Sequence, residues 1–409
     1  MNKRTIFQAV AALLLIFLSG AVVTACSNDD DADDSVQQTV IMFCPFAEGL
    51  YNPINTNIAD IKNAIADNHG TGNTRFVVYH VNNSKQASIY ELTYEGGKTV
   101  EKYWKKDIDV SKSSPDTYTT TEGLTSLLSS ITAHYPAENY SLIIGCHGSN
   151  WLPTGIRLDH IDNPFGASKP LRSFGAANDS NYKITVPQLV EALSAANIHC
   201  RFILFDVCYM AGIEIAYDLR HSADYLIVSP TEVMAAGLPY RNLTMPLLRH
   251  DYKAVVNAFA SYYDGVSRNV NGQLDRRLGT LSVINCTAIE SLAQDMRTIN
   301  AAAVSTTPDI SKVQVLDGLS PSVFFDMLSW ARQIATPEQL TLLETHLKEA
   351  VPFEYHTHSL FSKINVERIR PISECCGLTI SDPTQNTDVI PTLTKPTGIR
   401  PRMGSNEYQ

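Results

Sequence analysis

The chain has 409 residues, of which 44% are hydrophobic and 18% are charged, enough to build one large or two ordinary globular domains with buried cores. This composition argues against a disordered chain. A formal net charge of −10 and a pI near 5.6 disfavour nucleic acid as the main partner, because phosphate binding depends on clustered lysine and arginine. Basic side chains or peptides are better candidates for what this surface attracts.

The N-terminus is typical of an export signal. Two basic residues precede an apolar stretch over 6–25, which ends in the small residues Thr24 and Ala25 before Cys26. An apolar run of this length also suits a transmembrane helix, which is the alternative. The residues before Cys26 resemble the lipobox of bacterial lipoproteins. That resemblance implies that residues 1–25 are a removed signal peptide and that a lipid on Cys26 holds a soluble protein to a bacterial membrane.

Residues 26–37 are predicted to form an acidic tether. Five aspartates fall between positions 27 and 34, and no apolar pattern accompanies them. Such a run buries nothing and is expected to be solvated. It is also similar to the export signal of surface-exposed lipoproteins in Bacteroidota, which implies a location at the outer membrane or cell surface.

Seven cysteines remain beyond Cys26, an odd number, and no two of them have CxxC spacing. A disulfide framework or a structural zinc site is therefore disfavoured. His356 and His358 have the spacing of a metal pair on a strand, but no third ligand follows at a recognisable interval. No metal site is expected.

From residue 38 onward, apolar runs alternate with helical patterns. Strands are predicted at 39–46, 74–81, 140–146, 202–206 and 223–230, and helices at 56–67, at 186–196, at 210–219 and from a cap at Thr121. A hairpin is predicted around Gly96 and Gly97. Short apolar strands between helices are typical of a parallel sheet with helices on both faces.

A long polar excursion interrupts this pattern over 152–182, and loops of this length in a compact domain are usually functional or disordered. Residues 251–385 are expected to continue the fold and to extend the substrate cleft, and 386–409 to form an irregular tail. Helices are predicted there at 251–266, 288–303, 322–335 and 337–350, with strands at 279–285 and 377–381.

Two predicted strands end in residues capable of catalysis. The strand over 140–146 is followed by His147 and Gly148, and the strand over 202–206 ends at Asp206, two residues before Cys208. In open parallel sheets, the active crevice lies beyond the carboxyl ends of the strands. The 61 positions from His147 to Cys208 fit one loop, one helix and one strand, so we expect both residues to face one crevice from neighbouring strands.

This arrangement suits thiol chemistry, because an imidazole takes the proton of a thiol whose pKa lies near 8.5. A helix starting directly after Cys208 would add the positive end of its dipole, and the N–H groups of Gly148 and Cys208 would form an oxyanion hole. Taken alone, a cysteine after an apolar strand is more often a core residue than a catalyst. The order and strand context of both residues favour catalysis here.

The segments CHGSNW (146–151) and FDVCYMAG (205–212), with VSPTEVMAAGLPY (228–240), resemble the clostripain family of cysteine peptidases, peptidase family C11, over about residues 38–385. The resemblance implies an α/β fold: a caspase-like three-layer α/β/α sandwich with a mostly parallel central sheet and helical C-terminal additions. Residues 38–250 would form its catalytic core. Asn150 stands where the family commonly has glycine, and asparagine tolerates positive φ.

On matching positions, the resemblance implies that Cys208 is the nucleophile, His147 its general base and Gly148 an oxyanion donor. Asp206 would line the pocket that selects Arg or Lys before the cleaved bond, since a buried carboxylate favours a cationic partner. The alternative for Asp206 is a carboxylate that caps the next helix. Further extension of the pocket is expected from Ser229, Thr231 and Glu232.

Many family members are zymogens cleaved between the two motifs after a basic residue. The segment KPLRSFG (169–175) looks exposed, which makes Lys169 and Arg172 the candidates for self-cleavage. Dyad chemistry requires no cofactor. Some relatives depend on calcium; the sequence has no DxDxDG loop, and calcium is left open.

The predicted function is therefore a surface-anchored, monomeric cysteine endopeptidase that cleaves proteins or peptides after Arg or Lys. Two alternatives stay open. One is a catalytically silent caspase-like lipoprotein that binds peptide or glycan, and the other is a caspase-like peptidase with non-basic specificity.

Overall fold

The computed structural model describes residues 36–111, 117–150, 172–270, 273–302, 308–319, 322–363 and 368–382. The chain divides into two compact units, residues 1–35 and 36–409, and every described residue belongs to the second. The predicted signal peptide, Cys26, Lys169 and the tail from 386 lie outside the described residues.

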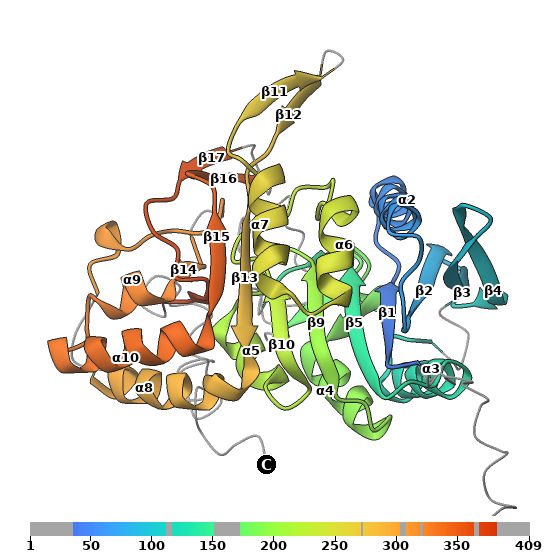
Figure 1. The fold of residues 1–409 in the computed structure, drawn as a ribbon. Helices are drawn as coiled ribbons and strands as arrows, with labels where there is room; N and C mark the ends of the chain where they lie inside the picture. The colour runs from blue at the N-terminus through green and yellow to red at the C-terminus, as the bar shows by residue number, and fades with distance from the viewer. Residues whose placement is uncertain are drawn as a thin grey trace, which may run out of the picture. The chain divides into compact units, whose positions relative to one another are not determined.

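A nine-stranded sheet in the order β15-β13-β10-β9-β5-β1-β2-β3-β4 forms the centre of the second unit (Figure 1). Its strands are β1 (Gln38–Cys44), β2 (Thr74–Asn83), β3 (Gln86–Glu95), β4 (Lys98–Asp109), β5 (Asn139–Gly145), β9 (Cys200–Asp206), β10 (Ala223–Val228), β13 (Thr280–Asn285) and β15 (Phe353–His356). The five strands from β10 to β2 pair in parallel, while β13 and β3 run against them. The two outermost strands, β15 and β4, return to the common direction, so the mostly parallel sheet is confirmed.

Alternate side chains of the strands face two different layers of helices. On β1, Ile41 and Phe43 belong to one buried cluster, and Val40 and Met42 to another. The first cluster includes helices α3 (Thr121–His134), α4 (Val186–Ala195), α5 (Ile213–Leu219), α8 (Ile289–Ala302), α9 (Met327–Ala331) and α10 (Pro337–Ala350). The second includes α2 (Tyr51–Asp67), α6 (Tyr240–Leu248) and α7 (Tyr252–Tyr262). Burial on both faces explains why the strands read as continuous apolar runs, and it confirms the three-layer sandwich.

Smaller elements surround this sandwich. They are the three-stranded sheet of β6 (His147–Gly148), β7 (Ser173–Gly175) and β8 (Lys183–Thr185), the pairs β11 (Ser267–Val270) with β12 (Gln273–Arg276), β14 (Phe325–Asp326) with β18 (Thr379–Ile380) and β16 (Ser359–Ser362) with β17 (Arg368–Pro371), and the 3₁₀ turns Ser180–Tyr182, Cys286–Ala288 and Ile310–Lys312. In Figure 1 the β11–β12 hairpin stands out from the sheet.

Local sequence sets several of these boundaries. Gly96 and Gly97 adopt φ of 56° and 84° in the predicted hairpin turn, a conformation that glycine adopts without strain. Helix α3 is capped by Thr120, whose hydroxyl accepts the Gly123 N–H at 3.0 Å, so the cap lies one residue earlier than predicted. Thr185 forms a capping box at the start of α4.

Several predicted helices are shorter than expected: the one predicted over 251–266 spans only Tyr252–Tyr262, and two others are interrupted by pairing with other segments. The helix predicted from residue 210 begins at Ile213, because residues before it hydrogen-bond to other segments: Ala211 N–H donates to Ser229 at 3.2 Å and the Ala211 carbonyl accepts from Thr379 at 2.9 Å. The helix predicted over 322–335 is replaced by β14 and the short α9. In both places, pairing across the fold overrides the local pattern.

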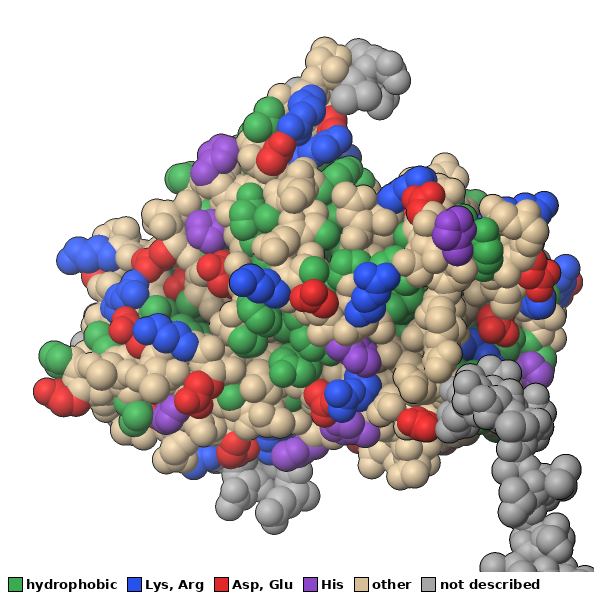
Figure 2. All heavy atoms as spheres, in the orientation of Figure 1, with side chains coloured by type: hydrophobic (Ala, Val, Ile, Leu, Met, Phe, Trp, Pro, Cys, Tyr) green, Lys and Arg blue, Asp and Glu red, His purple; other side chains and the backbone are tan. Residues whose placement is uncertain are grey.

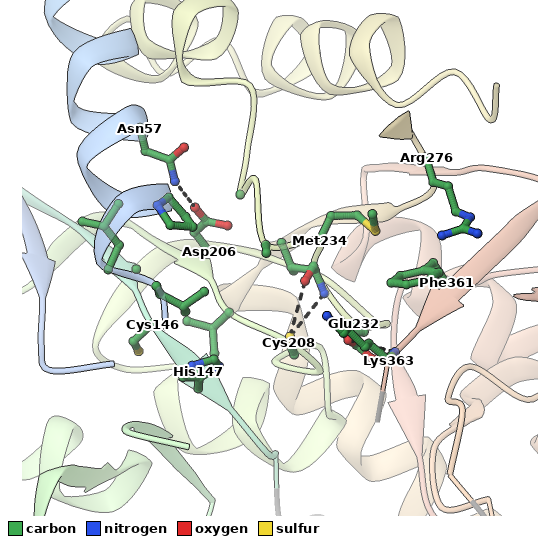
Figure 3. A pocket seen from close by; sticks show the side chains of 18 residues that line it. Asn57, Cys146, His147, Asp206, Cys208, Glu232, Met234, Arg276, Phe361 and Lys363 are labelled. Carbon is green, nitrogen blue, oxygen red and sulfur yellow. Dashed lines mark hydrogen bonds between the residues drawn. The ribbon is translucent and has the colours of Figure 1, made fainter. Parts of the chain in front are cut away.

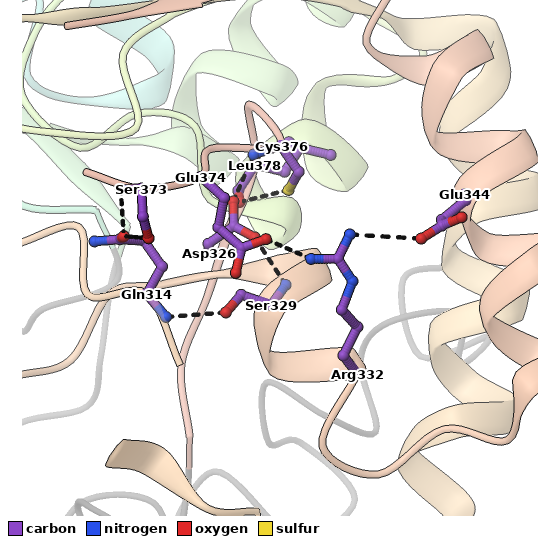
Figure 4. Close-up of polar contacts among 9 residues, drawn as sticks. All are labelled: Gln314, Asp326, Ser329, Arg332, Glu344, Ser373, Glu374, Cys376 and Leu378. Carbon is purple, nitrogen blue, oxygen red and sulfur yellow. Dashed lines mark hydrogen bonds and ion pairs between the residues drawn. The ribbon is translucent and has the colours of Figure 1, made fainter. Parts of the chain in front are cut away.

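The region around α9 is tied to the C-terminal segment by buried and exposed polar contacts (Figure 4). Asp326 is buried; its carboxylate accepts the Ser329 N–H at 2.8 Å and the Cys376 N–H at 2.5 Å. Arg332 pairs with Glu374 and, at 3.5 Å, with Glu344 of α10. These contacts fasten separate segments of the C-terminal additions to one another.

Acidic and basic side chains are interspersed on the face shown in Figure 2. No helix within the described ranges combines the length and apolar character that a membrane crossing needs. All seven cysteines in this part of the chain are unpaired.

Candidate active site

A cavity of about 420 Å³ opens beyond the ends of β5 and β9. These strands are parallel neighbours, with Gly145 opposite Asp206, so the residues that follow them meet at one edge of the sheet. Its lining is made by Leu50, Pro53, Ile54, Asn57, Gly145, Cys146, His147, Asp206, Val207, Cys208, Glu232, Val233, Met234, Ala235, Gly237, Arg276, Phe361 and Lys363. In Figure 3, Cys208 lies between Asp206 and His147 on one side and Glu232 and Lys363 on the other.

The ring of His147 is oriented by the main chain of Glu48. Its Nε2 lies 2.7 Å from the Glu48 carbonyl oxygen, and because a carbonyl only accepts, Nε2 carries the hydrogen. In the neutral ring this leaves Nδ1 with the free lone pair. The backbone of His147 is held separately, by pairing with Gly175 of β7.

Cys208 rests against the loop that follows β10. Its Sγ accepts the Val233 N–H at 3.3 Å and lies 3.7 Å from the Val233 carbonyl, to which the thiol donates. Burial, and then the Glu232 carboxylate, raise the pKa of the Cys208 thiol, and the Val233 N–H opposes them. The thiol is therefore protonated at rest and needs a base before it reacts.

The two sequence motifs pack directly on each other. A Cβ on Gly148 would lie 2.2 Å from Val207 Cγ1 and 3.0 Å from the Cys208 carbonyl, so only glycine fits there. Asn150 adopts φ of 50°, as its tolerance of positive φ suggests, and its Nδ2 donates to the Tyr209 carbonyl at 2.7 Å. The residues after Cys208 form turns, and α5 begins five residues later. The expected helix dipole directly at Cys208 is therefore wrong.

Asp206 is a buried carboxylate at the cavity wall, 8% exposed. Its Oδ2 accepts the Tyr240 hydroxyl at 3.1 Å, the Leu238 N–H at 3.4 Å and the Asn57 side-chain amide at 3.4 Å. Burial raises the pKa of Asp206 to about 6, while the Leu238 and Tyr240 hydrogen bonds lower it. No donor comes from α5, so Asp206 does not cap the helix that follows it; the backbone amide that it accepts, that of Leu238, lies just before α6.

The three residues expected to extend the pocket have different positions. Ser229 and Thr231 are buried, share hydrogen bonds of 2.9 Å with the Thr280 hydroxyl and are not among the lining residues. Glu232 does line the cavity, and its carboxylate accepts the Lys363 N–H at 3.1 and 3.0 Å. Of these three, Glu232 has a place at the site.

Arg172 is 5% exposed, so its predicted exposure is wrong. Its guanidinium pairs with Asp218 of α5, and its carbonyl accepts the Val186 N–H at 2.8 Å. A protease cannot reach this bond without unfolding the segment. Lys169, the other processing candidate, lies outside the described residues.

Sequence reasoning missed lining residues from distant segments, such as Arg276, Phe361 and Lys363, and it also missed Glu48, Asn57 and Tyr240, which hold His147 and Asp206. Glu48 lies 99 positions from His147, and Asn57 lies 149 positions from Asp206. No local motif signals a partner at that separation. Tyr240 falls within the segment that resembles the family, but nothing in its spacing indicates a contact with Asp206. The described residues include no cluster of three or more His, Cys, Asp or Glu suited to a metal ion.

Several solved structures are similar to this chain. A secreted C11 cysteine protease from Bacteroides thetaiotaomicron, "iotapain", is 30% identical, with a TM-score of 0.77 over 91% of this chain and 99% of its own. An inactive zymogen C11 protease from Parabacteroides distasonis is 24% identical, with a TM-score of 0.70 over 87% of this chain and 98% of its own.

A second structure of a secreted C11 cysteine protease from B. thetaiotaomicron contains an irreversible peptide inhibitor. It is 20% identical, with a TM-score of 0.67 over 85% of this chain and 92% of its own. No curated protein matches the chain. The model of the clostripain family, Peptidase_C11, matches residues 46–345, and the chain therefore belongs to the clostripain family of cysteine peptidases.

Proposed function

We propose that this cysteine peptidase is an endopeptidase that uses Cys208 as nucleophile and His147 as general base, and that it cleaves after Arg or Lys. One observation carries the proposal: a single cavity contains a thiol, an imidazole with one ring nitrogen already engaged, and a buried carboxylate. The first two groups supply the chemistry, and the third supplies a site for a cation.

In the proposed reaction, Nδ1 of His147 takes the Cys208 proton and the thiolate attacks the carbonyl carbon of the scissile bond. The oxyanion accepts the N–H groups of Gly148 and Cys208. His147 then returns the proton to the leaving amine, which departs as the C–N bond breaks. Water, deprotonated by His147, hydrolyses the thioester and frees Cys208. The thiol must release the Val233 carbonyl before its proton passes to His147.

Specificity would come from Asp206. Its carboxylate lies at the cavity wall where Asn57 and Tyr240 hold one oxygen in place. A guanidinium or ammonium group would compensate the buried negative charge, whereas a neutral side chain would not. Basic substrates are therefore favoured over substrates with Leu, Asn or Asp before the cleaved bond.

The test is hydrolysis of fluorogenic peptides with Arg, Lys, Asn, Asp or Leu before the scissile bond, by protein lacking residues 1–26. Cleavage after Arg or Lys should vanish in Cys208→Ala and His147→Ala. Cleavage after Asn or Asp alone would support the non-basic alternative. Silence across the panel, with and without calcium, would support a binding lipoprotein. Chelation by EDTA decides the open question of calcium.

We propose that Lys169 is the self-processing site, since Arg172 is buried in an ion pair. Cleavage mapped by mass spectrometry after Lys169, and its loss in Lys169→Ala and in Cys208→Ala, is the expected result. An active enzyme that remains unprocessed would contradict it.

Attachment through Cys26 to the bacterial surface is proposed as well, from the lipobox-like residues before it.

A further inference from the structure

Glu48 touches the proposed base with its main chain and a neighbouring segment with its side chain. It lies in the loop between β1 and α2, and its carbonyl accepts the His147 Nε2–H at 2.7 Å. The side chain of Glu48 turns elsewhere: Oε2 accepts the Ala177 N–H at 2.7 Å, and Oε1 accepts the Asp179 N–H at 3.2 Å. Both carboxylate oxygens are therefore used to hold one segment of backbone.

That segment is continuous with the strand that holds His147. Strand β7 ends at Gly175, which pairs with His147, and Ala177 and Asp179 follow directly. The backbone of His147 is thus fixed by β7, and its ring is fixed through Glu48 by the residues just after β7. One segment of chain therefore holds both the ring and the backbone of His147.

The other end of the Glu48 loop is also anchored. The Phe46 N–H donates to the Tyr118 hydroxyl at 3.0 Å, and its ring packs on Tyr182 with centroids 5.0 Å apart. Gly49 follows at φ of 77°, with nothing within 4 Å of where its Cβ would be. The Leu50 N–H donates to the Ala47 carbonyl at 3.2 Å and closes a turn around Glu48, and the Glu48 carboxylate fastens this turn to the segment after β7.

We propose that Glu48 is a positioning residue of this peptidase, whose carboxylate fixes the carbonyl that orients His147. With Nε2–H held, Nδ1 is the ring nitrogen left to accept the Cys208 proton and cannot exchange roles with Nε2. This inference rests on the proposed roles of His147 and Cys208. It assigns to Glu48 no contact with substrate.

The groups that titrate near His147 surround it on both sides. Cys146, Asp206, Cys208, Glu232, Arg276 and Lys363 line the same main cavity as His147, and Lys183 lines a second, small cavity that His147 also lines. Burial lowers the pKa of Lys183, and the Glu48 carboxylate opposes that shift. Removing the Glu48 charge changes this environment, so an isosteric neutral variant is needed to separate charge from hydrogen bonding.

The experiment compares Glu48→Ala and Glu48→Gln with Asp251→Ala in the protein lacking residues 1–26. Asp251 is a matched control, because its carboxylate also accepts a backbone N–H, that of Ala254 at 3.0 Å, and it is not among the cavity-lining residues. For Glu48→Ala we expect kcat to fall about tenfold or more, with KM for a small basic substrate within about twofold, because general-base positioning is lost and Asp206 is untouched.

Glu48→Gln should retain most of the activity, because its amide oxygen still accepts one of the two N–H groups. In a plot of kcat/KM against pH, the acidic limb for Glu48→Gln should stay near that of the wild type, whereas the acidic limb for Glu48→Ala should change. Asp251→Ala should lower Tm and leave kcat unchanged. A kcat for Glu48→Ala within twofold of the wild type, or a loss matched by a fall in Tm with an unchanged pH profile, would overturn the proposal.

A second measurement does not require a substrate. Alkylation of Cys208 by iodoacetamide, located by mass spectrometry, reports the reactive thiolate that His147 supports. Slower alkylation in Glu48→Ala than in Glu48→Gln supports the inference even if no peptide is cleaved, in which case the proposed specificity alone fails. Equal rates in the wild type and both variants would show that Glu48 does not position His147.

Discussion

The buried Asp206 carboxylate destabilises the folded protein, and it is also the proposed binding site for a basic side chain. Burial raises its pKa to about 6 from an ordinary 3.8, so the folded protein holds the proton more tightly than the unfolded chain. The stability penalty is absent below the unfolded pKa and complete above the folded one. A shift of about two units corresponds to roughly 3 kcal/mol at neutral pH.

The first prediction concerns this penalty. Asp206→Asn should raise Tm at pH 7.5 by a few degrees, because the neutral amide needs no compensation for a buried charge. At pH 4, where the wild-type carboxyl is protonated, the difference should nearly vanish. Thermal melts of both proteins across this pH range provide the measurement. A variant that is less stable at pH 7.5 would mean that the hydrogen bonds of Asp206 outweigh its desolvation.

The same titration predicts the pH dependence of binding. Below about pH 6 the Asp206 carboxyl becomes neutral, and its attraction for a basic side chain is lost. KM for a Lys or Arg substrate should therefore rise as pH falls through about 6. At pH 7.5, kcat/KM of Asp206→Asn should be about 10²-fold lower than that of the wild type. Steady-state kinetics from pH 5 to 8 test this. A KM independent of pH would remove Asp206 from cation recognition.

Gly237 offers a third prediction at the residue scale. It adopts φ of 71°, and a Cβ there would lie 2.4 Å from Asn57 Nδ2 and 2.6 Å from Asp206 Oδ2. Gly97 is a control, since it has φ of 84° but open space around its Cβ. Both alanine variants should lose about 1–2 kcal/mol of stability from backbone strain. Gly237→Ala alone should also impair cleavage after Lys or Arg, because its Cβ would displace the Asp206 carboxylate. Equal kinetics for the two variants would show that the close approach of Gly237 to Asp206 does not matter for cleavage.

At the scale of elements, the sequence pattern predicted those strands and helices whose boundaries depend on neighbouring residues alone. Strands β5 and β9 were predictable because burial on both faces leaves continuous apolar runs, and the motif residues follow their ends directly. The start of α5 could not be predicted in this way, because residues before Ile213 pair with segments near Ser229 and Thr379. Glu48 and Asn57 reach the site only through folding, so neither carries a sequence signal.

A fourth prediction concerns helix α9, where Asp326 is both the N-cap and the acceptor for Cys376. Asp326→Ala should cost more stability than Thr336→Ala at the cap of α10, because it leaves the buried Ser329 N–H and the partly buried Cys376 N–H without this acceptor and opens a void. A Thr336→Ala change should cost about 1 kcal/mol. Chemical denaturation of the two variants measures the difference, and equal losses would mean that the Asp326 contacts contribute no more than an exposed cap.

At the scale of the whole molecule, attachment and catalysis should be separable. No cavity-lining residue in the described part of the chain precedes Leu50, whereas the proposed lipid site is Cys26. Cys26→Ala should therefore lose fatty-acid labelling and leave the membrane fraction, because one residue carries the acyl anchor. Its kcat/KM should equal that of protein lacking residues 1–26. If Cys26→Ala remained with membranes, the apolar stretch over 6–25 would be a retained anchor; if kcat/KM fell instead, the N-terminal segment would take part in the active site.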